Sequence, residues 1–224
     1  MSRLIGSFVA CLAVCFAATV ALADDAAKAS GSEEGFVSLF DGKTLDGWQG
    51  NKKGYVVKDG SIVCDPAGGG GNLYTEKEYS DFVLRFEFKL TEGANNGIGI
   101  RTPMQGDPAY VGMEVQVLDD SSDKYKGIKD WQRHGSVYGI IAAKRGHLKP
   151  VGEWNTEEIT VNGRKVKVVL NGVTIVEGDL DEASTPNTLD GRNHPGLKNE
   201  KGYIAFCGHG TPVEFRNLKI KELK

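Results

Sequence analysis

The feature that most constrains the fold is the alternating segment at residues 81–91, DFVLRFEFKLT. Phenylalanine or leucine occupies every second position from Phe82 to Leu90, and most of the positions between them are charged. A period of two places successive side chains on opposite faces of an extended strand. The segment is therefore predicted to be a strand with one face in the core and the other in water, as is common in antiparallel sheets.

Paired turn residues divide much of the remaining chain into short strands. Asp59-Gly60 separates two such segments, and Asn162-Gly163 and Asn171-Gly172 divide residues 157–177 into three. These pairs favour tight hairpin turns. Further strands are expected at residues 36–40, 135–142, 202–207 and 213–220.

Helical patterns are almost absent from the sequence, and we expect only a single turn near Asp181. About a dozen short strands without crossover helices predict antiparallel sheets packed face to face. The predicted fold class is therefore all-β, a sandwich of two antiparallel sheets.

The segment at residues 110–119, YVGMEVQVLD, carries a polar pair inside an apolar strand pattern. Alternation places the apolar residues beginning with Met113 on one face, and Glu114 and Gln116 on the other. Their side chains would stand about 7 Å apart along the strand. This face either lies in bulk water or lines a pocket, and we expect the pocket.

The preceding segment, GANNGIGIR, alternates differently. Ile98 and Ile100 share one face, whereas Gly97, Gly99 and Arg101 share the other. Glycines on a strand face allow another group to approach the backbone closely. We therefore expect this bare face, with its arginine, to lie beside the strand that carries the polar pair.

The N-terminus has the pattern of an export signal. An uncharged run follows Arg3, and Ala21-Leu22-Ala23 supplies the small residues of a cleavage site. An uncleaved anchor and a lipoprotein signal ending at Cys15 are the alternatives. Cleavage would give a secreted or periplasmic protein with no membrane anchor. The predicted organisation is a signal peptide at 1–23, a flexible leader at 24–34 and one domain at 35–224.

The charge balance argues against nucleic acid or an anionic membrane as a partner. Loss of Arg3 with the signal leaves 26 basic residues against 30 acidic ones, a net charge of −4. Cys64 and Cys207 would remain, either as one disulfide or as two buried thiols. The four glycines at 68–71 are interpreted as a flexible loop rather than a phosphate cradle, because no lysine and no helix follow them. The oligomeric state is not predicted.

Several short motifs occur in a fixed order along the domain: LFDGKTLDGW at 39–48, DF at 81–82, ANNGI at 94–98 with Arg101, GMEVQVLD at 112–119, GSVYG at 135–139, EWN at 153–155 and HG at 209–210 followed by FRN at 215–217. This ordered set resembles the 3-keto-disaccharide hydrolase domain family, secreted bacterial domains with a concanavalin A-like jelly-roll fold. Two positions depart from the family pattern. Asn96 stands where the family usually has serine, and Cys207 stands where it often has glutamine.

The resemblance implies cleavage of glycosides whose glucose ring carries a ketone at carbon 3. A base would remove the hydrogen at carbon 2, and the enolate would expel the group at carbon 1. Water would then add back, or fail to add and leave a lyase product. In this hypothesis Glu114 is the base, Arg101 or a divalent cation stabilises the enolate, and His209 is the acid or a metal ligand.

The same hypothesis assigns the sugar contacts to Gln116, Asn96, Tyr138, Asp119 and Trp154, the last of which is equally interpretable as a core residue. A divalent cation, if present, would use Glu114, His209 and His134. Residues 121–134 are interpreted as a loop that acts as a flap.

Other interpretations of these residues stay open. A carbohydrate-binding module would need no base, and an ordinary glycosidase would need a second carboxylate. Glu114 and Gln116 could be solvated, Arg101 could pair with an exposed acid, and His209 could cap a turn. The remaining histidines lie in polar loops and are expected to be exposed to solvent, namely His134, His147 and His194.

Overall fold

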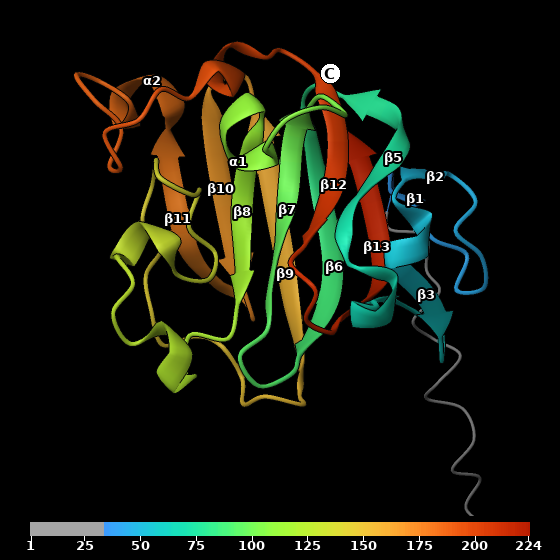
Figure 1. Ribbon diagram of the computed structural model, residues 1–224. Helices are drawn as coiled ribbons and strands as arrows, with labels where there is room; N and C mark the ends of the chain where they lie inside the picture. Colours follow the sequence, from blue (N-terminus) through green and yellow to red (C-terminus); the bar gives the residue numbers. More distant parts are fainter. Residues whose placement is uncertain (1–33) are drawn as a thin grey trace, which may run out of the picture. The chain divides into compact units, whose positions relative to one another are not determined.

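The computed structural model describes residues Glu34–Lys224, so the predicted signal and nearly all of the leader lie outside the described residues. Within this range the chain forms two sheets in which every strand pair is antiparallel, which confirms the predicted fold class. In Figure 1 strands β8, β7, β12 and β5 form the front layer, with β9, β6 and β13 behind them. No helix among the described residues is long and apolar enough to cross a membrane.

The larger sheet has eight strands. In spatial order they are β11 (Val173–Asp179), β10 (Lys165–Leu170), β9 (Trp154–Asn162), β6 (Phe82–Leu90), β13 (Val213–Glu222), β4 (Ser61–Cys64) and β3 (Tyr55–Lys58), with β1 (Val37–Ser38) paired to β13. The hairpin at Asp59-Gly60 and the three-stranded meander are confirmed, because β3 pairs with β4 and β10 pairs with both β9 and β11.

The smaller sheet has five strands. In spatial order they are β2 (Trp48–Gly50), β5 (Gly71–Tyr79), β12 (Gly202–Gly208), β7 (Asn95–Thr102) and β8 (Met113–Leu118). The remaining elements are one-turn helices: α1 (Pro108–Val111), α2 (Leu180–Ala183), η1 (Lys52–Gly54), η2 (Pro66–Gly68), η3 (Asp123–Tyr125), η4 (Asp130–Gln132) and η5 (Pro195–Lys198). The helical turn predicted near Asp181 is α2.

The core lies between the two sheets and is rich in aromatic rings. Phe206 of β12 stacks on Phe215 of β13 with ring centroids 4.1 Å apart, and on Trp48 of β2 at 5.0 Å. The apolar face of β6 is buried along its whole length, from Phe82 to Leu90. Burying such large rings dominates the hydrophobic stabilisation of a domain of this size.

Three details differ from the predictions. Residues 135–142 are turns with isolated bridges rather than a strand, because Gly135 and Gly139 adopt φ values of 76° and 74° that turn the chain. Tyr110 belongs to α1 and not to the strand that follows it. Strands β2 and β5 were not predicted, and β5 begins at the last of the four consecutive glycines.

Gly68 and Gly70 are packed closely against backbone, whereas a Cβ atom on Gly69 would meet no atom within 4 Å, and the flexibility predicted for this loop stays a prediction. A Cβ atom at Gly68 would lie 1.7 Å from the carbonyl oxygen of Lys53, and one at Gly70 would lie 2.8 Å from the amide nitrogen of Gly210. Backbone therefore packs directly on backbone here, which only glycine permits. The contact with Gly210 supports the turn that carries His209.

Candidate functional site

A cavity of about 290 Å³ lies over the outer face of β8. Met113, Val115 and Val117 point into the core, so the opposite face of the strand carries Glu114 and Gln116, as predicted. Both polar residues line the cavity, and each is only 5% exposed. The interpretation of this face as solvated is therefore wrong.

Glu114 lies in the cavity with one carboxylate oxygen unpartnered. Its Oε1 is buried and accepts no hydrogen bond. A Cβ atom on Gly97 of β7 would lie 1.8 Å from this oxygen, so the bare glycine face provides the room that the carboxylate occupies. Burial raises the pKa of Glu114 to about 8, and the negative charge of Asp107 adds to this effect.

The amide of Gln116 is held by β7. Its Nε2 donates to Oδ1 of Asn95 at 2.9 Å, and Asn95 also lines the cavity. Asn96 faces the core instead, because it pairs across the ladder with the core residue Val117. The prediction that Asn96 contacts sugar is therefore wrong, and the alternation of the strand assigns that place to Asn95.

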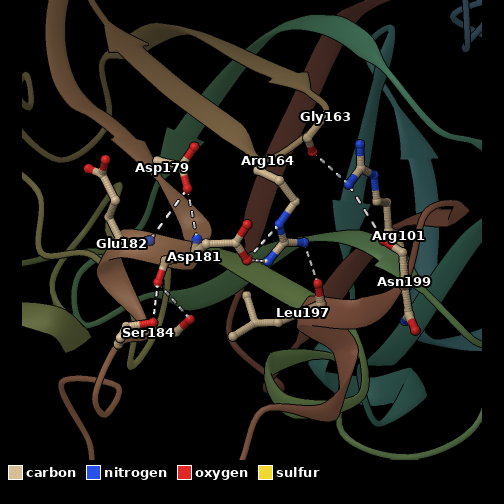
Figure 2. Close-up of polar contacts among 10 residues, drawn as sticks. Arg101, Gly163, Arg164, Asp179, Asp181, Glu182, Ser184, Leu197 and Asn199 are labelled. Carbon is tan, nitrogen blue, oxygen red and sulfur yellow. Dashed lines mark hydrogen bonds and ion pairs between the residues drawn. The ribbon is translucent and has the colours of Figure 1, made fainter.

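Arg101 lies outside the cavity, so the prediction that it shares a site with Glu114 is wrong. Its φ of 47° and a register shift between β7 and β12 interrupt the alternation at this point of the strand. The guanidinium donates to Oδ1 of Asp81 at 2.6 Å and to the carbonyl oxygen of Gly163 at 3.0 Å, the latter shown in Figure 2. Burial lowers the pKa of Arg101, and Asp81 opposes that effect.

Asp119 and Trp154 also lie outside the cavity, contrary to their predicted contacts with sugar. The carboxylate of Asp119 accepts hydrogen bonds from the backbone amides of Gly93 at 2.8 Å and Ser121 at 3.1 Å, so it stabilises the neighbouring loops. The ring of Trp154 is on the outer face of the larger sheet, with the guanidinium of Arg216 3.8 Å from its centroid. It is therefore neither a core residue nor a wall of the site.

Tyr138 lines the cavity, and its hydroxyl accepts from Nε2 of Gln132 at 3.2 Å, while its contact with sugar stays a prediction. Gln132 belongs to the loop at residues 121–134, which also contributes Tyr125 and Ile128 to the wall. The loop therefore covers one side of the site, and its action as a flap stays a prediction.

His209 lines the cavity from the turn after β12. Its pKa is lowered by the surrounding protein atoms and by the positive charge of Lys124, while Asp107 acts in the opposite direction. The residue is exposed to solvent, so its imidazole is accessible at the cavity, and its role as an acid stays a prediction.

The histidines expected to be exposed are mostly buried. His134 and His194 are 4% and 5% exposed, and His147 is half-buried. His134 accepts from the amide of Leu118 at 3.3 Å, and its Nε2 lies 3.0 Å from Oε2 of Glu157 in the sandwich interior. His134 and His194 are buried because each ring lies against a carboxylate, Glu157 and Asp190 respectively. No sequence pattern had indicated either of these contacts.

The predicted metal ligands do not come together. His134 is paired in the interior with Glu157, whereas Glu114 and His209 line the cavity. In the described part of the chain, no group of three histidine, cysteine, aspartate or glutamate side chains could hold a metal ion. The residues present therefore do not fit the predicted ligand set.

Cys64 and Cys207 are free and buried, which decides between the two alternatives for this pair. Cys64 belongs to the main core, whereas Cys207 packs with Tyr74 and Ala205 in a small separate cluster. Burial raises the pKa of the Cys207 thiol, and the charge of Glu114 adds to the effect.

Three charged or aromatic residues of the site were missed from the sequence. Asp107 is the N-cap of α1 and accepts from the amide of Ala109 at 3.1 Å, and Tyr110 follows in the same helix. Arg192 donates to the Tyr110 hydroxyl at 2.8 Å. The Asp-Pro pair was a signal for the start of a helix. Arg192 lies in a loop rich in glycine and proline, where no sequence pattern indicated a site.

The comparisons with known proteins cover the whole of this site. Residues 35–221 match the model of the 3-keto-alpha-glucoside-1,2-lyase-like domain. A 3-keto-disaccharide hydrolase from Bacteroides thetaiotaomicron is 31% identical over 229 residues, covering 85% of this chain and 79% of that protein.

Solved structures give the same picture. Two candidate glycosyl hydrolases from Parabacteroides distasonis are similar with TM-scores of 0.71 and 0.73 at 27% and 29% identity, and they cover 85% and 84% of this chain and 95% and 99% of their own. The carbohydrate-binding module CBM66 from Bacillus subtilis has a TM-score of 0.52 at 12% identity over 79% of this chain and 96% of its own, which shows a shared fold.

Proposed function

Because the chain belongs to the 3-keto-alpha-glucoside-1,2-lyase-like domain family, we propose that it cleaves glycosides whose glucose ring carries a ketone at carbon 3. Its family and relatives make it a carbohydrate-active protein that acts on glycosides. The observation that carries the finer proposal is Glu114, a buried carboxylate with an unpartnered oxygen in the cavity.

Glu114 has the properties of a general base for a carbon acid. The ketone at carbon 3 acidifies the hydrogen at carbon 2, so a carboxylate can remove it. Burial raises the pKa of Glu114 to about 8, which makes its ionised form a stronger base than a solvated carboxylate. Gly97 leaves the space in which Oε1 lies.

The remaining groups of the cavity match the other needs of the reaction. The electrons of the carbon 2–hydrogen bond form the enolate, whose negative charge would be stabilised by Arg192 in the place first assigned to Arg101. The bond from carbon 1 to the glycosidic oxygen then breaks, its electron pair goes to that oxygen, and His209 supplies the proton. Water added across the new double bond completes hydrolysis, and its absence gives a lyase product.

The direct test is turnover of a purified 3-keto-glucoside, with and without chelator, by the wild type and Glu114→Gln. We expect the variant to lose turnover by a factor of about 10² to 10⁴, the usual contribution of a general base, while still binding the sugar. Product analysis then separates hydrolase from lyase. Absence of any product from the wild type would overturn the proposal, and sugar binding without turnover would favour a carbohydrate-binding module.

An unmodified glucoside is the matched control substrate. It lacks the acidic hydrogen at carbon 2, so we expect no cleavage. Equal rates on both substrates would contradict the elimination route and favour an ordinary glycosidase in which Asp107 supplies the second carboxylate of the cavity.

The pH dependence of the rate follows from the pKa of Glu114. Below about pH 8 the carboxyl is protonated and cannot accept the hydrogen, so removal of the hydrogen from carbon 2 should speed up about tenfold for each pH unit and level off above that value. His209, whose pKa is lowered, loses its proton within the same range, so the test is exchange of the carbon 2 hydrogen with solvent deuterium between pH 5 and 9, a step that needs no acid. Exchange that is flat between pH 5 and 8 would exclude Glu114 as the base.

A further inference from the structure

A buried aspartate–histidine pair, Asp190 and His194, lies directly behind the wall of the cavity. Nε2 of His194 is 3.1 Å from both carboxylate oxygens of Asp190, and the two side chains are 0% and 2% exposed for His194 and Asp190 respectively. Neither side chain lines the cavity. The pair is therefore separate from the groups that a ligand would touch.

One side of the pair holds α1. Nδ1 of His194 lies 3.1 Å from the carbonyl oxygen of Ala109, and the imidazole packs on the ring of Tyr110 with centroids 4.8 Å apart. Both ring nitrogens thus face oxygen acceptors. Ala109 and Tyr110 line the cavity, so the ring of His194 fixes this part of the wall from behind.

The other side of the pair holds two more segments. Oδ1 of Asp190 accepts from the amide of Arg192 at 2.9 Å, which fixes the backbone from which the Arg192 side chain reaches Tyr110. The amide of Asp190 donates to the carbonyl oxygen of Gly139 at 3.1 Å. A Cβ atom on Gly139 would lie 2.6 Å from Oδ2 of Asp190, so the turn that presents Tyr138 packs directly on the pair.

We infer that Asp190 and His194 form the positioning pair of the cavity, which holds Tyr110, Tyr138 and Arg192 in a fixed arrangement around the substrate. These three residues lie in a one-turn helix, a turn and a loop, and although the amide of Tyr138 donates to the carbonyl oxygen of Glu114 at 2.8 Å, no strand ladder joins the three residues to one another. The inference rests on the proposed function for its effect on turnover. Pairs of this kind act through the residues that they orient.

The kinetic test is a double-mutant cycle between His194→Ala and Arg192→Ala on a 3-keto-glucoside. We expect His194→Ala to lower kcat/KM by about 10- to 100-fold, as loss of a supporting partner commonly does. Because His194 would act partly through Arg192, the double variant should lose less than the product of the two single losses. His194→Gln keeps one hydrogen-bond donor and should restore part of the activity.

Asp81→Asn is the control for a loss of stability alone, because it removes a buried charge contact that is remote from the cavity. It should leave kcat/KM unchanged. The inference is overturned if folded His194→Ala retains the wild-type kcat/KM, or if the losses of His194→Ala and Arg192→Ala multiply.

A crystal structure of His194→Ala separates this inference from the proposed function. We expect the 2.8 Å contact between Arg192 and the Tyr110 hydroxyl to be lost. If the wild type turns over no 3-keto-glucoside, the proposed function fails. The positioning role of Asp190 and His194 is then tested by the contact between Arg192 and Tyr110 alone. An unchanged contact in the variant overturns the positioning pair whatever the activity.

Discussion

Glu114 and Arg101 are buried titratable residues on two neighbouring strands, and their surroundings are opposite. Arg101 is 3% exposed and donates to Asp81, to the carbonyl oxygen of Ser80 and to that of Gly163. Glu114 is 5% exposed, and its Oε1 has no partner. An isolated buried charge is costly, whereas a buried charge with hydrogen-bonding partners is tolerated. The difference indicates that Arg101 is held by the fold, and it supports our proposal that Glu114 is kept for a ligand at the expense of stability.

The largest effect expected from this comparison is a gain in stability on Glu114→Gln. The pKa of Glu114 rises from 4.5 in the unfolded chain to about 8 in the fold, so the folded protein holds the proton more tightly. Wild-type stability therefore falls relative to the variant as the pH rises from 4.5 to 8. Above pH 8 the variant should be more stable by an amount of the order of 5 kcal/mol. Urea unfolding at pH 4, 6 and 8 measures this.

The control for this gain is Glu87→Gln on the outer face of β6. Glu87 accepts from Arg216 at 2.8 Å and is partly exposed, so its replacement should change stability by less than about 1 kcal/mol. A Glu114→Gln variant that is less stable than the wild type at pH 8 would mean that the carboxylate has partners, and the contrast with Arg101 would disappear.

Arg101→Met should have the next largest effect, with the opposite sign. It removes the partner of Asp81 and the donor to the Ser80 and Gly163 carbonyl groups, and breaking such a buried pair costs about 3–5 kcal/mol. The folded fraction should keep the wild-type kcat/KM, because Arg101 does not line the cavity. Thermal unfolding together with active-site-normalised rates tests both statements. A variant that keeps wild-type stability but loses activity would show that Arg101 belongs to the functional site after all.

The sequence predicted the sheets well because strand alternation and turn residues are local signals. The period of two at 81–91 and the Asn-Gly turns depend only on neighbouring residues, and β6 and the meander of β9 to β11 follow them. Residues 135–142 contain the same apolar residues as a strand, but two glycines with positive φ turn the chain. The conformation of those glycines is set by contacts that are distant in sequence.

Strand alternation predicted only the part of the cavity that β7 and β8 line, whereas Tyr138 and His209, which lie in turns, were predicted from the family resemblance. Glu114 and Gln116 follow from the alternation of β8, and Gly97 follows from that of β7. The same alternation applied strictly would have chosen Asn95 over Asn96. Arg192 reaches the cavity from a loop some 80 residues along the chain from Tyr110, and that approach depends on tertiary packing alone.

Gly97→Ala tests how closely the bare face fits Glu114. The new Cβ would lie 1.8 Å from Oε1, so the carboxylate must move. A displacement of about 1 Å at a reacting group can cost about 10²-fold in rate, and we expect a loss of that size in kcat. Gly127→Ala, on the loop that forms the cavity wall, meets no atom within 4 Å and is the matched control. Unchanged kinetics in Gly97→Ala would show that the position of the carboxylate is not critical.

Trp154→Leu should have the smallest effect. It tests the contrast between Arg101 and Glu114 at a residue on the larger sheet, outside the cavity. The indole lies on the outer face of the larger sheet beneath the guanidinium of Arg216, a contact worth about 0.5–1 kcal/mol. We expect stability to fall by about that amount and both kcat and KM to stay unchanged, because the ring stacks on a cation and not on sugar. A rise in KM without a loss of stability would indicate a second sugar contact on the outer face of the larger sheet. The cavity over β8 would then not be the sole sugar-binding face among the described residues.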